Sequence, residues 1–379
     1  MPVKLAVPKE DALGESRVAL VPDVAKRLEA MNIEVIIEKE AGSLAGFPDQ
    51  LFGQTVSIAE NKKALLETAD IILKVQPPTL EEISLYKEGA ILLGFLAPYA
   101  SGDQRILALK EKKITSFSME LVPRISRAQS IDALSSQASA AGYKAVLIAA
   151  QLSNKFFPML TTAAGTIRPA QVLIIGAGVA GLQAIATAKR LGAIVEAYDV
   201  RSATKEQVQS LGAKFIDMQM SADSAGGYAR ELTEQEKAQQ QEILARHVAK
   251  ADAVITTAAI PGRPSPKIIT EAMIASMKPG AVIVDIAAEG GGNTALTRAG
   301  EKVIYNGVTI FGPINLPSQL AAHASEMYSK NLLNFLSLFI NKEGNIHVDW
   351  NDQIIADSAL THDGSICHNS TRERLEKKA

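Results

Sequence analysis

The chain has 379 residues, 47% of them hydrophobic and 21% charged, so it is long enough for two ordinary domains with sizeable cores. Its formal net charge of −2 provides no basic field, and no nucleic-acid partner is expected. The single cysteine, Cys367, excludes an internal disulfide framework and fits a reducing cytoplasm. The amino terminus does not resemble a signal peptide, and no apolar run reaches the roughly 18 residues that a membrane span needs. The composition therefore predicts a soluble protein.

Short apolar segments alternate with helical periodicity through the first third of the chain. Strands are expected at residues 5–8, 34–37, 71–73, 90–93 and 114–119, and helices at 23–31 and 57–68. This alternation favours parallel βαβ units. No glycine fingerprint follows any of these strands, so this region of the chain is not expected to hold a pyrophosphate.

A polar stretch at residues 123–132 precedes an alanine-rich segment that reaches residue 152, which predicts a connecting helix. A second alternating series follows, with strands expected at 172–175, 194–199, 214–216, 253–257 and 282–286. Residues 317–340 predict another long helix, which can return the chain to the first domain. The charged tail, residues 371–379, is expected to fray.

These patterns predict an α/β protein with two Rossmann-like, doubly wound parallel-sheet domains joined by two long helices, with a cleft between the domains. The first domain is expected to be discontinuous, comprising residues 1–134 and 318–379. The second, residues 135–317, is expected to bind the dinucleotide.

The strongest motif is an apolar strand followed by Gly-Ala-Gly-Val-Ala-Gly and the start of a helix. In such a turn Gly176 makes the tight bend, Gly178 lets the backbone approach a pyrophosphate, and Gly181 permits close helix–strand packing. The phosphates then meet free N–H groups at the positive end of a helix. A G-x-G-x-x-G triplet alone is weak evidence, but here strand, turn and helix are all present.

The next strand ends at Asp199, 23 residues after Gly176, where an acid is expected to contact the ribose hydroxyls. Its charge would repel a 2′-phosphate, which favours NAD over NADP. Arg201 is the one dissenting residue, and it is expected to be solvated or to serve the adenine side. The motif therefore predicts an NAD(H) site.

The histidines favour a reaction without proton transfer. Dehydrogenases that act on a carbonyl or an amine usually move the proton through His, Lys or Tyr. None of the five histidines lies at the carboxyl end of a predicted strand; they are His247, His323, His347, His362 and His368. Hydride transfer between two nicotinamides needs no such residue. No metal-ligand spacing, G-x-S-x-G or P-loop is present.

Several segments together resemble one family. Residues 119–137, Met-Glu-Leu-Val-Pro-Arg-Ile-Ser-Arg-Ala-Gln-Ser-Ile-Asp-Ala-Leu-Ser-Ser-Gln, closely resemble the signature loop of the NAD(H)-binding component of proton-translocating nicotinamide nucleotide transhydrogenases. The other matching segments are residues 162–166, 176–189, 199–208, 225–229, 256–262 and 330–335. The resemblance covers nearly the whole chain. Because the chain ends before any membrane helix, it resembles the form of the family in which the other components are separate polypeptides.

The resemblance implies roles for individual residues. Arg124, Gln129 and Asp132 match the family's catalytic triad at the nicotinamide end, and an Arg124–Asp132 pair could fix their loop. From the residues alone, a polar loop capping the long helix explains them as well. The cofactor-binding residues implied by the match are Ser135, Ser136, Gly176, Gly178, Val179, Gly181, Asp199, Val200, Arg201, Gly227, Tyr228, Gln240, Ala258 and Ala259. Among these, Gly227 and Tyr228 match a mobile loop over the nucleotide, for which a surface turn is the alternative.

Two other functions remain open. Arg17 and Lys74 match the substrate-carboxylate and carbonyl positions of alanine dehydrogenase, a relative of the same architecture. The catalytic histidine position of that enzyme is occupied here by Phe95, so its acid/base group is missing. A non-catalytic NAD-sensing module would keep the glycine turn, but it has no need of Arg124, Gln129 and Asp132.

The resemblance also implies partners. NADH bound by this chain would pass a hydride to NADP+ held by an NADP(H)-binding component docked over Gln129. A membrane-spanning proton-channel subunit would couple the transfer to proton movement. Relatives suggest a homodimer built through the first domain and the linking helices. The protein is thus expected to be cytoplasmic and held at the inner membrane through its partners.

Overall fold

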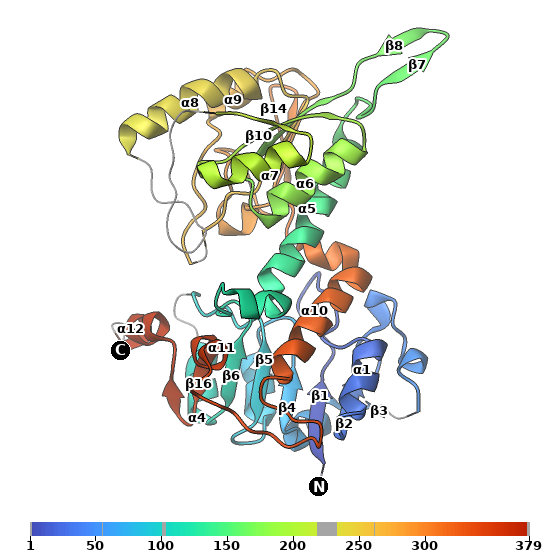
Figure 1. Ribbon diagram of the computed structural model, residues 1–379, viewed down its shortest axis with the longest axis vertical. Helices are drawn as coiled ribbons and strands as arrows, with labels where there is room; N and C mark the ends of the chain where they lie inside the picture. Colours follow the sequence, from blue (N-terminus) through green and yellow to red (C-terminus); the bar gives the residue numbers. More distant parts are fainter. Residues whose placement is uncertain (1, 55, 101–103, 218–232, 261, 377–379) are drawn as a thin grey trace. The chain divides into compact units, whose positions relative to one another are not determined.

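The computed structural model describes residues 2–54, 56–100, 104–217, 233–260 and 262–376 (Figure 1). The chain divides into two compact units. Unit 1 comprises Met1–Gln137 and Ser318–Ala379, and unit 2 comprises Ala138–Pro317. The helix α5 (Ala133–Leu152) begins in unit 1 and ends in unit 2.

Unit 1 contains an eight-stranded sheet of order β17-β16-β6-β5-β4-β1-β2-β3, in which β1 to β6 run parallel. Its strands are β1 (Val3–Val7), β2 (Ile33–Glu38), β3 (Ser57–Ala59), β4 (Ile71–Leu73), β5 (Ile91–Gly94), β6 (Thr115–Ser118), β16 (Ala359–His362) and β17 (Ser365–Ile366). Its helices are α1 (Pro22–Glu29), α2 (Lys62–Thr68), α3 (Leu80–Leu85), α4 (Gln104–Glu111), α10 (Ala321–Leu336), α11 (Gln353–Ser358) and α12 (Asn369–Glu376). The 3₁₀ helices η1 (Ser43–Ala45), η2 (Asp49–Phe52) and η3 (Ser126–Ile131) complete it.

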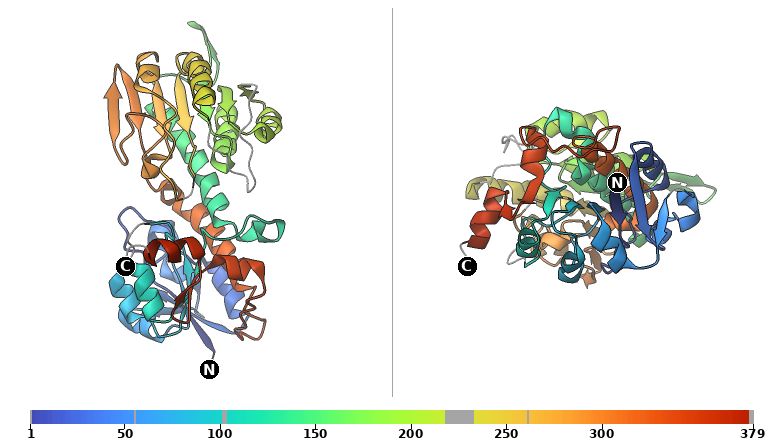
Figure 2. Two further views of the ribbon diagram at one scale, coloured as in Figure 1. Left: turned by 90° about the vertical axis from the view of Figure 1, so that its left-hand side faces the viewer. Right: turned by 90° about the horizontal axis from the view of Figure 1, so that it is seen from below.

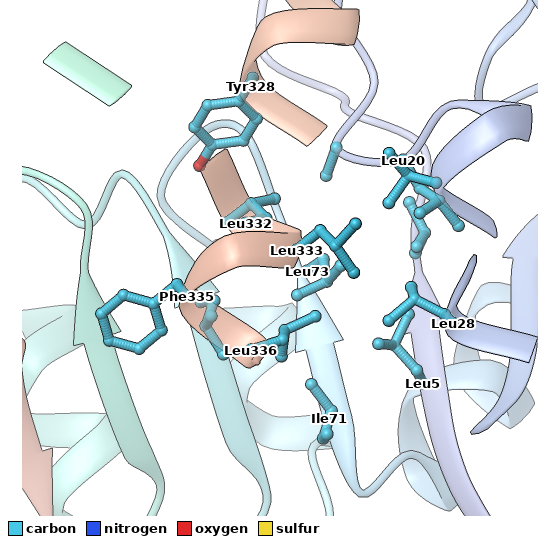
Figure 3. Close-up of a cluster of buried hydrophobic side chains, with 14 of the residues drawn as sticks. Leu5, Leu20, Leu28, Ile71, Leu73, Tyr328, Leu332, Leu333, Phe335 and Leu336 are labelled. Carbon is cyan, nitrogen blue, oxygen red and sulfur yellow. The ribbon is translucent and has the colours of Figure 1, made fainter. Parts of the chain in front are cut away.

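The sheet of unit 1 is buried on both faces. Alternate residues of a strand point to opposite faces, so Leu5 joins the core beneath α1 and α10 while Ala6 joins the core on the other side. Figure 3 shows Leu28 of α1 and Leu336 of α10 meeting β1 and β4 on the first side. This two-sided burial explains why the strands are nearly continuous apolar runs.

Unit 2 contains a seven-stranded sheet of order β11-β10-β9-β12-β13-β15-β14, parallel except for β14. Its strands are β9 (Gln171–Ile175), β10 (Ile194–Tyr198), β11 (Lys214–Phe215), β12 (Ala253–Thr256), β13 (Val282–Asp285), β14 (Lys302–Tyr305) and β15 (Val308–Phe311). Its helices are α6 (Val179–Arg190), α7 (Lys205–Ser210), α8 (Glu234–Val248) and α9 (Glu271–Ala275), with the 3₁₀ helices η4 (Ser202–Thr204) and η5 (Ala288–Gly290). The hairpin formed by β7 (Leu160–Thr162) and β8 (Gly165–Ile167) stands away from this sheet (Figures 1 and 2).

The fold class expected from the alternating pattern, two Rossmann-like parallel sheets, is confirmed. Within the described residues, no helix combines the length and the apolar character that a bilayer crossing requires.

Three local expectations were wrong. The helix expected from residue 57 begins only at Lys62, because Ser57–Ala59 pairs with β2 and Asn61 caps the helix. The helix expected over 317–340 starts as a 3₁₀ turn, η6 (Leu316–Leu320), and ends at Leu336. The tail is helical to Glu376 rather than frayed, because buried Thr371 bonds the carbonyl of Pro98.

Candidate functional site

The glycine turn of unit 2 requires glycine at its first position. Gly176 follows β9 with a φ of +96°, and a Cβ there would lie 2.4 Å from the hydroxyl oxygen of Thr257. Its N–H donates to the carbonyl of Tyr198 at 2.8 Å, and its carbonyl accepts from Thr257 Oγ1 at 3.2 Å. The bend is thus held from the strands on both sides of β9.

The other two glycines of the motif differ in their surroundings. A Cβ at Gly181 would lie 1.9 Å from the carbonyl oxygen of Gly176, so helix α6 can approach the turn only with glycine there. A Cβ at Gly178 would meet only the guanidinium of Arg201, at 4.0 Å. Gly178 caps α6 without a side-chain bond and Val179 is exposed, so the helix N-terminus is open to an anion.

Asp199 stands next to this turn with its side chain 6% exposed. One carboxylate oxygen accepts the N–H of Ala177 at 2.7 Å. The carboxylate also pairs with Arg201, whose Nη2 lies 2.7 Å and whose Nε lies 2.9 Å from its two oxygens. Arg201 is therefore not solvated, contrary to expectation, because the acid two residues earlier turns back to bind it.

A hollow of about 120 Å³ opens beside Asp199. Lys205 stands on its rim, and the neighbouring Gln240 supports it from α8 by donating to the hydroxyl of Tyr198 at 2.8 Å. Burial raises the pKa of Tyr198, so this hydroxyl stays protonated. The hollow is lined by Tyr198, Asp199, Val200, Ser202, Lys205, Phe215 and Asp217.

The segment after β12 is held by a buried asparagine. Asn293 Oδ1 accepts the N–H of Ala258 at 3.0 Å, and Asn293 Nδ2 donates to the carbonyls of Ala258 and Pro266 at 2.7 and 2.9 Å. Asp285, at the end of β13, accepts the N–H of Asn293 in turn. Ala258, and with it the adjoining Ala259, is therefore fixed at the edge of the sheet that carries the glycine turn.

Sequence reasoning did not single out Thr257 or Asn293. Thr257 directly follows β12, as Asp199 follows β10, and the carboxyl ends of parallel strands share one edge of a sheet. That position was a usable signal for Thr257. Asn293 lies eight residues after β13, and only the tertiary bonds reveal it.

In unit 1 the signature loop, residues 123–132, forms η3 before α5. Arg124 and Gln129 are exposed. Asp132 binds Ser135 twice, through its N–H at 2.9 Å and its hydroxyl at 2.6 Å, and so caps α5. Asp132 forms no ion pair with Arg124 among the described residues, because its carboxylate is held at the helix N-terminus.

Ser136 lies one residue further along α5. Its hydroxyl donates to Asn331 of α10 at 2.7 Å and is close to the carbonyl of Ala133. Gly227 and Tyr228 lie outside the described residues.

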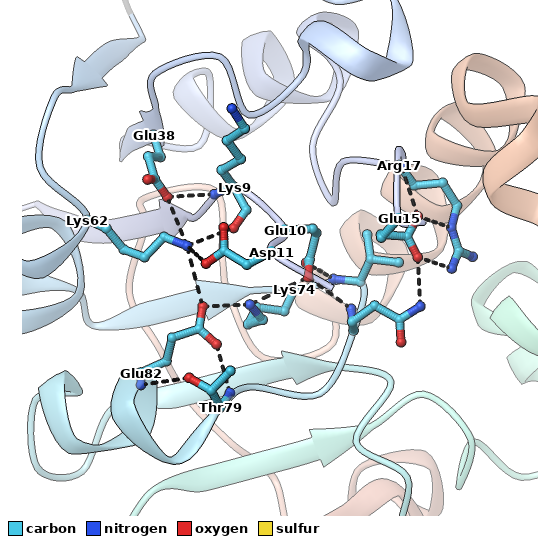
Figure 4. Close-up of polar contacts among 12 residues, drawn as sticks. Lys9, Glu10, Asp11, Glu15, Arg17, Glu38, Lys62, Lys74, Thr79 and Glu82 are labelled. Atoms are coloured by element: carbon cyan, nitrogen blue, oxygen red, sulfur yellow. Dashed lines mark hydrogen bonds and ion pairs between the residues drawn. The ribbon is translucent and has the colours of Figure 1, made fainter. Parts of the chain in front are cut away.

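The cations that match alanine dehydrogenase positions are buried and paired (Figure 4). Arg17 is bound bidentately by Glu15, with Nη2 and Nε at 2.6 and 2.9 Å from its oxygens. Lys74 lies 2.8 Å from Glu82 and 3.5 Å from Glu10. Burial lowers the pKa of Lys74, but the two carboxylates outweigh it and raise the pKa, which keeps the lysine charged.

Phe95 packs in the core of unit 1, with its ring stacked on Tyr328 at 5.1 Å between centroids. Of the histidines, His247 and His323 lie in α8 and α10 as expected. His362 is the last residue of β16, contrary to expectation, but this strand runs antiparallel to β6. Within the described ranges, no group of three or more His, Cys, Asp or Glu residues could hold a metal ion.

The chain matches both domains of one family along nearly its whole length. Residues 6–141 match "Alanine dehydrogenase/PNT, N-terminal domain" and residues 145–369 match "Alanine dehydrogenase/PNT, C-terminal domain". The chain is 48% identical to the first of the polypeptides that form the NAD(P) transhydrogenase alpha subunit of Rhodospirillum rubrum, over 97% of this chain and 98% of that protein. "Alanine dehydrogenase" of Methanococcus maripaludis is 28% identical, over 89% of this chain and 87% of that protein.

Solved structures agree with this assignment. The crystal structure of transhydrogenase from Sinorhizobium meliloti has a TM-score of 0.85 and 42% identity, covering 97% of this chain and 99% of that one. A solved L-alanine dehydrogenase shares the fold, with a TM-score of 0.81 and 22% identity over the full length of both chains. NAD(H) is the cofactor of this family, so the cofactor prediction is confirmed at that level. The chain therefore belongs to the alanine dehydrogenase/PNT family, in which transhydrogenase alpha subunits are nearer relatives than alanine dehydrogenases.

Proposed function

We propose that this chain is the NAD(H)-binding subunit of a proton-translocating transhydrogenase. It holds NADH for direct hydride transfer to NADP+ on a partner component, and a membrane subunit couples the transfer to proton movement. The observation that carries the proposal is the full-length match to a transhydrogenase alpha-subunit polypeptide at 48% identity. The local geometry of the glycine turn supports it.

The residues of unit 2 suit the adenosine and pyrophosphate portions of the cofactor. The open backbone at Gly178 and the uncapped start of α6 provide N–H donors for the phosphates. Asp199 is placed to accept ribose hydroxyls, provided that Arg201 gives up some of its pairing. Val179 and Val200 add apolar contact beside these groups. Ala258 and Ala259 border the same edge, and Gly227 and Tyr228 are proposed to cover the nucleotide.

The residues of the signature loop suit the nicotinamide end. The exposed Arg124 and Gln129 can donate hydrogen bonds to the carboxamide or the ribose, and Gln129 can also touch the second nucleotide. Ser135 and Ser136 present hydroxyls in the first turn of α5, with Asp132 orienting the first of them. Bound nicotinamide supplies the chemistry: a hydride, two electrons and one proton, leaves C4 of NADH and joins C4 of NADP+. No protein residue has to take up a proton.

No observation favours alanine dehydrogenase. Arg17 and Lys74 are 4% and 2% exposed and are neutralised by the chain's own carboxylates, so neither is available to a keto acid. Phe95 has no proton to exchange and packs on Tyr328. We expect no NADH oxidation with pyruvate and ammonia, and robust oxidation by this chain alone would overturn the proposal in favour of that enzyme.

The decisive experiment mixes the purified chain with an NADP(H)-binding component and follows reduction of an NAD analogue by NADPH. Transfer should require both proteins and should fall strongly in Gln129→Ala. Gln353→Ala is a control, because the side chain of Gln353 bonds Asp357 of its own helix α11, away from the signature loop. A wild-type mixture that transfers nothing would refute the proposal, as would Gln129→Ala transfer at the wild-type rate. A non-catalytic NAD-sensing module would bind NADH and give no transfer in this mixture.

The proposal extends to assembly and location. A homodimer formed through unit 1 and α5 is expected, and sedimentation of the purified chain measures it directly. The chain is proposed to be cytoplasmic and peripheral to the inner membrane. It should therefore co-sediment with membranes that contain the channel subunit, and not with membranes that lack it.

A further inference from the structure

The end of the signature loop is held by two asparagines of α10. Asn331 Nδ2 and Asn334 Nδ2 donate to the carbonyl oxygen of Ser130 at 2.9 and 3.0 Å. The last carbonyls of a short helix such as η3 have no partner within it, and a carbonyl can accept two bonds. The two amides therefore fill both acceptor positions of Ser130, next to the exposed Gln129.

Asn331 also reaches the start of α5. Its Oδ1 accepts from the hydroxyl of Ser136 at 2.7 Å, and its side chain is buried, at 7% exposure for the residue. One amide group thus joins the last turn of η3 to the first turn of α5 across 201 and 195 residues of chain. Both segments carry residues proposed to contact the nicotinamide end.

The same network continues into the buried ion pairs of unit 1. Gln137 Nε2 donates to Ser136 Oγ at 3.2 Å and to the carbonyl of Ala324 at 3.1 Å. Gln137 Oε1 accepts from Arg17 Nη1 at 2.8 Å, and Arg17 is bound by Glu15. Arg17, which the proposed reaction does not otherwise use, therefore orients the glutamine that supports Ser136.

A separate contact holds the beginning of η3. Arg127 binds Asp352 bidentately, with two N–O distances of 2.6 Å, and Asp352 caps α11 by accepting the N–H of Ile354. The loop is therefore fixed on both sides of Gln129. An exposed pair contributes little stability, whereas a buried amide that bonds two segments at once determines their relative position.

We infer that Asn331 is a positioning residue for hydride transfer, acting through Ser130 and Ser136 on the loop that carries Gln129. The inference rests on the proposed function. Asn331 touches neither nucleotide; it sets where the loop lies. Because hydride transfer depends on sub-ångström placement of the donor and the acceptor, a loosened loop slows transfer more than it weakens NADH binding.

The test uses the full-length chain reconstituted with an NADP(H)-binding component. Asn331→Ala removes both bonds, Asn331→Asp keeps the acceptor for Ser136 and loses the donor to Ser130, and Asn334→Ala removes the other donor to Ser130. Ser329→Ala is the matched control, because Ser329 is also buried in α10 but bonds Val21 outside the loop. Each variant is assayed at a temperature well below its unfolding midpoint.

We expect kcat for transfer to fall on the order of 10- to 100-fold in Asn331→Ala and Asn331→Asp, with the Kd for NADH changed less than about threefold. Asn334→Ala should lie between them and the wild type, and Ser329→Ala should keep the wild-type kcat. Trypsin should cleave after Arg124 or Arg127 faster in Asn331→Ala than in Ser329→Ala.

The outcomes separate the two hypotheses. Wild-type transfer with an unchanged kcat in Asn331→Ala overturns the inference alone, as does an equal fall of kcat in Ser329→Ala. A parallel loss of NADH binding and kcat overturns it as well, since that would indicate a general structural role. Absence of transfer by the wild-type mixture overturns the proposed function and the inference together.

Discussion

Replacing Gly178 by alanine should abolish tight NADH binding and leave the fold intact. A Cβ at this position meets only the guanidinium of Arg201, at 4.0 Å, and the backbone is extended, with φ of −75° and ψ of −169°. Alanine caps a helix less well than glycine, but it also restricts the unfolded chain, and these effects nearly cancel at about 0.5 kcal/mol each. The free energy of unfolding should therefore change by less than about 1 kcal/mol.

The added methyl group would occupy the space through which a pyrophosphate approaches the start of α6. Losing one hydrogen bond to a charged phosphate costs about 1.5–3 kcal/mol, which raises the Kd for NADH roughly 10- to 150-fold. Gly181→Ala is the contrasting variant. Its Cβ would lie 1.9 Å from the Gly176 carbonyl, where real contacts essentially never fall below 3.0 Å. It should destabilise unit 2 by about 1–3 kcal/mol or more through overpacking.

The assay pairs NADH titration, followed by its fluorescence, with urea unfolding followed by far-UV circular dichroism. Gly178→Ala should unfold like the wild type and bind poorly, whereas Gly181→Ala should unfold at lower urea. A Kd for Gly178→Ala within twofold of the wild-type value would refute the reasoning. So would a loss of stability equal to that of Gly181→Ala, because the binding defect would then follow from unfolding.

Three further outcomes are expected. Arg201→Met releases the carboxylate of Asp199, so the ratio of the NADPH Kd to the NADH Kd should rise severalfold; an unchanged ratio, measured by titration, would contradict the ion pair's role. Burial raises the pKa of Glu15, but the bonds and charge of Arg17 outweigh it and lower the pKa to about 2, so roughly 3 kcal/mol of stability should be present above pH 4.5 and lost towards pH 2. Glu15→Gln should lack this acid transition in the fluorescence of the single tryptophan, and a retained transition would disprove the assignment. Asn293→Ala should weaken NADH binding and lower the unfolding midpoint of unit 2, since it leaves buried backbone groups unpaired, and wild-type values for both would argue against this clamp.

The largest differences between expectation and structure concern polar contacts. The pattern of apolar residues predicted Ile71–Leu73 and Val282–Asp285 to within a residue, because both strands are buried on two faces. It missed Ser57–Ala59, an exposed edge strand whose pairing with β2 overrides its helical periodicity. It also could not show that Asp132 binds Ser135 rather than Arg124.

The sequence by itself determined the two sheets and the glycine turn. Alternation in strands and the spacing of Gly176, Gly178 and Gly181 depend on interactions within a few residues, which a linear pattern records. Only the tertiary structure decided which charges are free. Arg17 is bound by Glu15, and Asn331 meets Ser130 across 201 residues. Such partners are chosen by how strands and helices pack, because a buried polar group must find its hydrogen bonds wherever the fold brings them.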